Sequence, residues 1–135
     1  MSFILDASMA MAWLFEDEAT PGSEAVLDRL AEEAALVPPL WPYEVGNVLV
    51  AAERRKRITE AQSRQFLGLL QGLPIRVASH GPLRAWDGAL ATARAHRLSA
   101  YDGAYLDLAM VEGLPLLTQD KALRAAALEA GVAVE

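Results

Sequence analysis

The 135-residue sequence contains no cysteine, only two histidines and no long uninterrupted hydrophobic run. Without cysteine the chain can form neither a disulfide framework nor a thiolate zinc site, so we expect a reducing, cytoplasmic location. His80 and His96 do not stand in a metal-ligand spacing. Charged residues interrupt every apolar stretch well before the ~20 residues that a membrane helix needs. The first residues lack the basic region of a secretory signal, so neither membrane insertion nor secretion is expected.

Basic residues are scarce relative to acids. Twelve Lys and Arg stand against 18 Asp and Glu, which gives a formal charge of −6. Proteins that hold nucleic acid mainly by neutralising phosphates are usually basic. The charge therefore argues against non-specific electrostatic binding as the main activity. It leaves open an enzyme that meets phosphate through a bound metal ion.

The length predicts a single domain over residues 1–135. Short apolar segments alternate with helical patterns, which predicts an α/β fold with a parallel sheet covered on both faces. The expected strands are residues 3–5, 36–37, 75–78, 116–118 and 132–134.

Caps and prolines place the helices between these strands. A short helix is expected over residues 8–15, and Thr20-Pro21 starts a helix whose apolar face would extend to Ala34. Residues 59–62 and 99–102 fit capping boxes. Gly81-Pro82 opens a helix whose expected apolar positions are Leu83, Trp86, Leu90 and Ala93.

Four acids follow strands or begin helices, at the carboxyl edge of the expected sheet, where α/β proteins bind ligands. They are Asp6, Glu44, Asp102 and Asp120. Each also has an ordinary explanation as a residue that caps a helix or complements its dipole, worth about 0.5–2 kcal/mol. Asp6 is harder to explain in this way, because it directly follows a buried strand.

If these carboxylates converge, their mutual repulsion favours a divalent cation, and an all-oxygen ligand set favours Mg²⁺ or Mn²⁺ over Zn²⁺. Such a metal can activate water and stabilise a phosphodiester leaving group. Ser8, Asn47 and Thr118 lie near these acids in sequence and could orient ligands or water. Helix capping by the two hydroxyls and filling of a polar gap by Asn47 are equally good interpretations.

The chain resembles PIN-domain proteins, and among them VapC-type toxins of toxin–antitoxin pairs. Four segments carry the resemblance, in order and at similar spacing: Asp6-Ala7-Ser8 after an apolar strand, residues 42–49, residues 101–106, and Leu117-Thr118-Gln119-Asp120. The resemblance implies a three-layer α/β/α sandwich with a short-stranded, mainly parallel central sheet. Gly103 departs from the pattern, which more often has alanine there, and we expect it to loosen its helical turn.

The resemblance further implies a ribonuclease with Asp6, Glu44, Asp102 and Asp120 as the catalytic, metal-binding quartet. A water held by Mg²⁺ or Mn²⁺ would attack RNA and leave a 5′-phosphate and a 3′-hydroxyl. The implied partners are a small cognate antitoxin protein that enters the active-site groove and a second copy of the chain in a homodimer. Without the four acids the formal charge would be −2, so much of the acidity belongs to the expected site.

Two other functions remain open, and so does the role of one basic segment. A receiver-like phosphoacceptor domain also gathers carboxylates at a sheet edge, although it would normally have an early acidic doublet. A PIN-like interaction module without catalysis is the other alternative. The basic run at residues 54–57 could hold RNA or an acidic segment of an antitoxin, or could simply be a solvated helix end favoured by the dipole.

Overall fold

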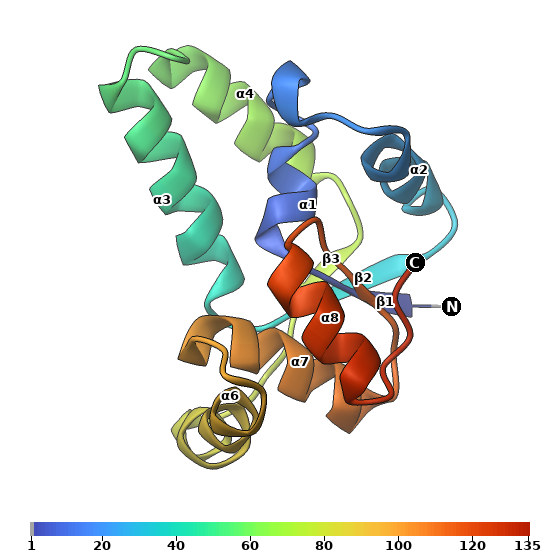
Figure 1. Ribbon diagram of the computed structural model, residues 1–135. Coiled ribbons are helices and arrows are strands. Elements are labelled where there is room, and N and C mark those ends of the chain that lie inside the picture. Colours follow the sequence, from blue (N-terminus) through green and yellow to red (C-terminus); the bar gives the residue numbers. More distant parts are fainter. Residues whose placement is uncertain (1) are drawn as a thin grey trace.

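The computed structural model describes residues 2–135 and has a four-stranded, all-parallel sheet at its centre (Figure 1). The strand order is β3-β2-β1-β4. The strands are β1 (Ser2–Leu5), β2 (Ala34–Val37), β3 (Ile75–Val77) and β4 (Leu116–Leu117). Helices cover both faces, which gives the expected three-layer α/β/α sandwich.

The middle of the sheet is apolar on both faces because it has no solvated side. Phe3, Ile4 and Leu5 of β1 are fully buried, as are Leu116 and Leu117 of β4. Such continuous apolar runs are typical of central parallel strands. In this sheet β1 pairs with β2 and β4, whereas a receiver-type order places β1 between β2 and β3. The topology therefore disfavours the receiver hypothesis.

The helical segments alternate with the strands along the chain. They are α1 (Ala7–Met11), the 3₁₀ turn η1 (Glu16–Glu18), α2 (Pro21–Arg29), α3 (Trp41–Arg54), α4 (Glu60–Gln71), α5 (Pro82–Arg84), the π-helical turn η2 (Ala85–Ala89), α6 (Leu90–His96), α7 (Ala100–Glu112) and α8 (Lys121–Glu129). α7 packs on β1 and β4, and α6 packs on α7. Within residues 2–135, no helix has both the length and the apolar character needed to cross a bilayer.

The expected caps form at three helix starts, with one difference. Thr20 and Thr59 make complete capping boxes, and Asp120 caps α8 by accepting a hydrogen bond from the Leu123 amide. At α7 only half of the expected box forms. The Ser99 hydroxyl accepts from the Asp102 amide, without the reciprocal bond to the Asp102 carboxylate. That carboxylate is therefore not committed to capping.

Several boundaries differ from the sequence-based expectation, and β3 and β4 each end one residue earlier than expected, at Val77 and Leu117. Ala34 belongs to β2 rather than to the apolar face of α2, because α2 already ends at Arg29. The expected strand at residues 132–134 is reduced to a single bridge between Val134 and Leu116. The helix expected over residues 8–15 ends at Met11.

The expected apolar face of the helix after Gly81 is wrong at Leu83 and Trp86, and correct at Ala93. Leu83 and Trp86 are 76% and 67% exposed, whereas Ala89 and Ala93 are buried. A π-helical turn at Ala85–Ala89 interrupts this helix, which a constant 3.6-residue period does not anticipate. This turn lies against α7, close to the segment that carries Asp102.

Candidate functional site

Asp6 lies at the carboxyl end of β1, where it precedes α1. Its amide donates to the carbonyl of Leu117 on the neighbouring strand, at 3.1 Å. Its carboxylate is buried, and Oδ2 accepts hydrogen bonds from Ser8 Oγ at 2.8 Å and Thr118 Oγ1 at 2.6 Å. The position and one oxygen of this carboxylate are thus fixed by groups from both central strands.

Ser8 and Thr118 join the ends of β1 and β4 into one polar network. Ser8 Oγ also accepts from the Gln119 amide at 3.1 Å, and Thr118 Oγ1 accepts from the Asp120 amide at 3.0 Å. Both hydroxyls therefore orient Asp6 and the backbone leading to Asp120. Asn47, the third supporting residue of the sequence-based hypothesis, has no hydrogen bond to any of the four acids within residues 2–135.

Glu44 lies in the first turn of α3 and is half-buried. Its carboxylate accepts a hydrogen bond from the hydroxyl of Tyr105, a fully buried residue of α7. Sequence reasoning did not assign Tyr105 a role. The available signals were its place in the segment 101–106 that carries the family resemblance and its position three residues after Asp102 on the same helix.

Asp102 and Asp120 complete the set of acids from two further segments. Asp102 is in the first turn of α7, and Asp120 is the N-cap of α8. Together with Asp6 and Glu44 they line a hollow of about 360 Å³. The structure thus brings all four expected acids to one place, although they come from four separate parts of the chain.

The same hollow has lining residues that the sequence did not single out. Glu18 of η1 and Met11 of α1 lie on its wall. Asn47, which the sequence did single out, lines it from α3. Glu18 belongs to a run of three acids in an irregular segment, which carries no periodic signal. Its place beside the quartet depends on the path of the chain after α1.

The carboxylates influence one another electrostatically. Burial raises the pKa of Asp6, while the hydrogen bonds from Thr118 and Ser8 oppose this shift. Burial raises the pKa of Glu44, and the carboxylates of Asp6 and Asp102 raise it further against the effect of Tyr105. Burial and repulsion by Asp120 and Asp6 raise the pKa of Asp102. The hollow is therefore a site of accumulated negative charge.

The donor set suits a hard divalent cation, because it consists of carboxylate oxygens without thiolate or imidazole. As the side chains stand, however, no three acidic or histidine groups within residues 2–135 are arranged to hold one ion. Asp6 is bound to two hydroxyls, Glu44 to Tyr105 and Asp120 to the Leu123 amide. The chemistry fits a metal, and binding would require these side chains to turn toward it.

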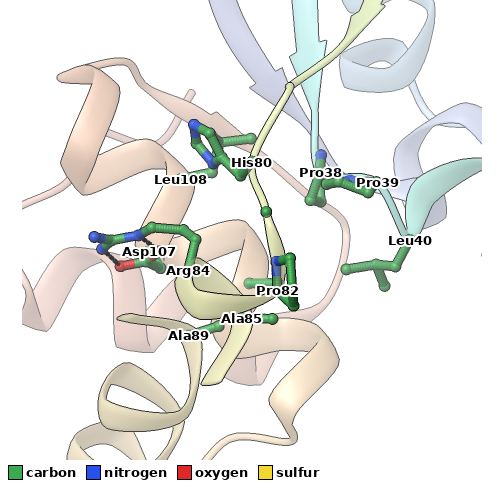
Figure 2. A pocket seen from close by; sticks show the side chains of 12 residues that line it. Pro38, Pro39, Leu40, His80, Pro82, Arg84, Ala85, Ala89, Asp107 and Leu108 are labelled. Carbon is green, nitrogen blue, oxygen red and sulfur yellow. Dashed lines mark hydrogen bonds and ion pairs between the residues drawn. The ribbon is translucent and has the colours of Figure 1, made fainter. Parts of the chain in front are cut away.

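A second cavity, of about 280 Å³, lies apart from the four acids (Figure 2). Prolines, alanines and leucines from the β2–α3 connection, from α5 and from α7 form much of its lining. Asp107 on its wall is buried and bound by the Arg84 guanidinium, with Nε to Oδ2 at 2.7 Å. Asp107 therefore has a structural partner and does not belong to the acidic hollow.

This chain is similar to known proteins in both sequence and fold. The sequence model of the PIN domain matches residues 3–129. Ribonuclease VapC3 of Pyrobaculum aerophilum is 30% identical over 123 residues, which make up 91% of this chain and 92% of that protein.

Solved structures are similar over almost the full length. The crystal structure of PAE2754 from Pyrobaculum aerophilum has a TM-score of 0.72 and 28% identity, over 99% of this chain and 92% of that one. A second similar structure is that of VapBC2 from Rickettsia felis, bound to a DNA fragment from the VapBC2 promoter. Its TM-score is 0.71 over 100% of this chain and 98% of that one. At 10% identity, the second likeness concerns the fold alone.

Proposed function

This chain belongs to the PIN domain family, and on that premise we propose that it is a metal-dependent endoribonuclease that acts as the toxin of a toxin–antitoxin pair. Its relationship to a ribonuclease over nine-tenths of both chains supports the activity. We further propose Asp6, Glu44, Asp102 and Asp120 as its catalytic and metal-binding residues.

One observation carries the assignment of the site. Four acids from four segments line one hollow, where burial and, in addition, repulsion from neighbouring carboxylates raise the pKa of Glu44 and Asp102. Crowding of like charges is unfavourable for folding, so its presence at a sheet edge calls for a compensating ligand. A divalent cation, with Mg²⁺ or Mn²⁺ as our specific proposal, supplies that compensation.

When bound, such a cation lowers the pKa of water and neutralises charge that develops on the phosphodiester. The residues of this chain position the four carboxylates around the hollow, from where the side chains would turn toward the ion. Ser8 and Thr118 fix one oxygen of Asp6, which leaves Oδ1 free of hydrogen bonds from them. Tyr105 holds Glu44, which α3 contributes to the hollow. Asp102 stays available because its carboxylate does not complete the capping box.

The activity is tested with purified protein and a labelled RNA. We expect cleavage with Mg²⁺ or Mn²⁺ and none with EDTA. Asp6→Asn should abolish cleavage while the protein stays folded by circular dichroism. Asp28→Asn, which removes one charge from the exposed surface of α2, is the matched control and should remain active. Full activity of Asp6→Asn would overturn the site, and an inactive wild-type protein would favour a non-catalytic module.

The partners follow from the same proposal. We propose a small antitoxin that blocks the acidic hollow, and a homodimer as the active form. Coexpression with the product of an adjacent short reading frame should give a stable complex without ribonuclease activity. Light scattering should give twice the chain mass for the free protein. We also propose a cytoplasmic location, with which an RNA substrate and a cysteine-free chain are both compatible.

A further inference from the structure

The acidic hollow does not end at the four acids. A second hollow, of about 260 Å³, shares Glu18, Asn47 and Val48 with it and reaches Arg55 and Arg57. Together the two form one groove between α3 on one side and α1 with η1 on the other. We refer to the second hollow as the α3 groove.

The floor of this groove follows one face of α3. Glu44, Val48, Ala51 and Arg55 are spaced by three or four residues, so they lie along one stripe of the helix. At 1.5 Å per residue, Arg55 lies about 16 Å from Glu44 along the helix axis. Figure 1 shows α3 leading away from the sheet toward its connection with α4. The groove therefore joins the acidic site to the basic end of α3.

The basic residues at this end differ in their partners. Arg57 pairs with Asp17 and with Glu18, the latter at 3.2 Å, and its guanidinium lies 3.9 Å from the centre of the Phe15 ring. It thus fastens η1 to the α3–α4 connection and forms part of the wall. Arg55, in contrast, is exposed and has no ion pair within residues 2–135. It is a free cation at the end of the groove.

We propose that the α3 groove binds the sugar–phosphate backbone of single-stranded RNA, with Arg55 contacting a phosphate a few nucleotides from the cleaved bond. This rests on the proposed function, because a strand whose phosphodiester lies at Asp6 must continue beyond the acidic hollow. The groove is a direct continuation, and its far end supplies the positive charge that the quartet lacks. A chain with net charge −6 needs such local cations to retain a polyanion.

Binding is tested with a fluorescein-labelled oligoribonucleotide and Asp6→Asn protein, which we expect not to cleave it. Arg55→Gln should weaken binding about three- to tenfold and reduce the slope of log K against log salt concentration by about 0.7, the value for one phosphate contact on a single strand. Arg54→Gln is the matched control, because it removes the same charge from the neighbouring residue outside the groove. Equal effects of the two substitutions would overturn the proposal.

Kinetics separate this proposal from the proposed function. In the active protein, Arg55→Gln should raise KM for a long oligonucleotide and leave kcat unchanged. If wild-type protein does not cleave RNA and Arg55→Gln still weakens binding selectively, the groove stands and the nuclease assignment fails. If wild-type protein cleaves RNA and KM does not change, the groove proposal fails. Selective loss of binding to a polyglutamate peptide, with RNA binding intact, would also overturn it in favour of an acidic protein partner.

Discussion

The hydroxyl of Tyr105, buried on α7, donates a hydrogen bond to the carboxylate of Glu44 on α3. This contact joins two helices that are 61 residues apart in sequence at this point. It also opposes the burial and repulsion that raise the pKa of Glu44. Tyr105 is therefore a positioning residue for the proposed site, although it does not line the hollow.

Tyr105→Phe should reduce metal-dependent activity about 10–100-fold, the range expected when a group that orients a metal ligand is lost. It should also lower stability by about 1–2 kcal/mol, because the half-buried carboxylate loses its donor. Activity against Mg²⁺ concentration and urea unfolding measure the two effects. Tyr43→Phe, at an 81% exposed position of α3, is the control and should change neither. If Tyr105→Phe lowers stability but leaves the dependence of activity on Mg²⁺ concentration unchanged, Tyr105 has a structural role only.

The packing around Gly103 leads to a second prediction. It also changes the role that the sequence suggested for this glycine. From sequence alone, glycine next to Asp102 suggested a loosened helical turn. In the structure, a Cβ at residue 103 would lie 2.7 Å from the Ala89 carbonyl oxygen and 2.9 Å from Ala93 Cβ. Gly103 therefore permits close packing of α7 against the π-helical turn and α6, which holds the Asp102 segment in place.

Gly103→Ala should therefore destabilise the protein by about 1–3 kcal/mol through overpacking, despite the better helix propensity of alanine. Gly68→Ala is the matched control, since a Cβ there would meet nothing within 4 Å in the middle of α4. That substitution should stabilise by up to about 1 kcal/mol. Thermal unfolding of both variants measures the difference. Equal stabilisation by the two would contradict the packing role.

The sequence predicts features that depend on neighbouring residues better than features that depend on packing between distant segments. The buried strands, the caps at Thr20 and Thr59 and the proline-started helices follow from neighbouring residues, and the structure has them. The four acids were expected at one edge because parallel strands end together, and they line one hollow. The Tyr105–Glu44 contact, the place of Glu18 and the π-helical turn arise from packing between distant segments, which no periodicity encodes.

The acidic hollow also predicts how stability depends on pH without metal. Asp6, Glu44 and Asp102 have raised pKa values in the folded protein, so the folded state holds protons to higher pH than the unfolded state. Their stabilising contribution is present below about pH 4, the ordinary carboxyl range, and is lost as pH rises through the raised values. The pKa of Glu33 is lowered, so its contribution to stability is lost as pH falls rather than as it rises. This loss occurs only below its ordinary pKa of 4.5.

Urea unfolding in EDTA should therefore show stability that falls as the pH is raised from about 4 through the raised pKa values of these carboxylates. Asp6→Asn removes one of the three raised carboxylates and should flatten this dependence. Excess Mg²⁺ should flatten it too, because binding to the ionised carboxylates stabilises the folded state at the higher pH. An increase of stability with pH in EDTA would show that the hollow does not hold repelling carboxylates.

The ion pair between Arg84 and Asp107 lies outside the acidic hollow (Figure 2). Its removal is expected to change stability without changing activity. The Asp107 side chain is only 7% exposed, so removing its partner leaves a buried charge. Arg84→Met should cost about 2–4 kcal/mol, somewhat below a fully buried pair because Arg84 is partly exposed. The double change Arg84→Met with Asp107→Leu should recover most of this loss, since an apolar pair can replace a buried ion pair.

Ribonuclease activity per folded molecule should be the same in the double variant and in the wild-type protein. Asp107 lies on α7 only five residues after Asp102, but its carboxylate faces Arg84 at the second cavity and not the quartet. Unfolding curves and single-turnover cleavage under conditions where both proteins are folded separate the two contributions. If the double variant is stable but inactive, Asp107 contributes to the reaction and the boundary drawn around the acidic hollow is wrong.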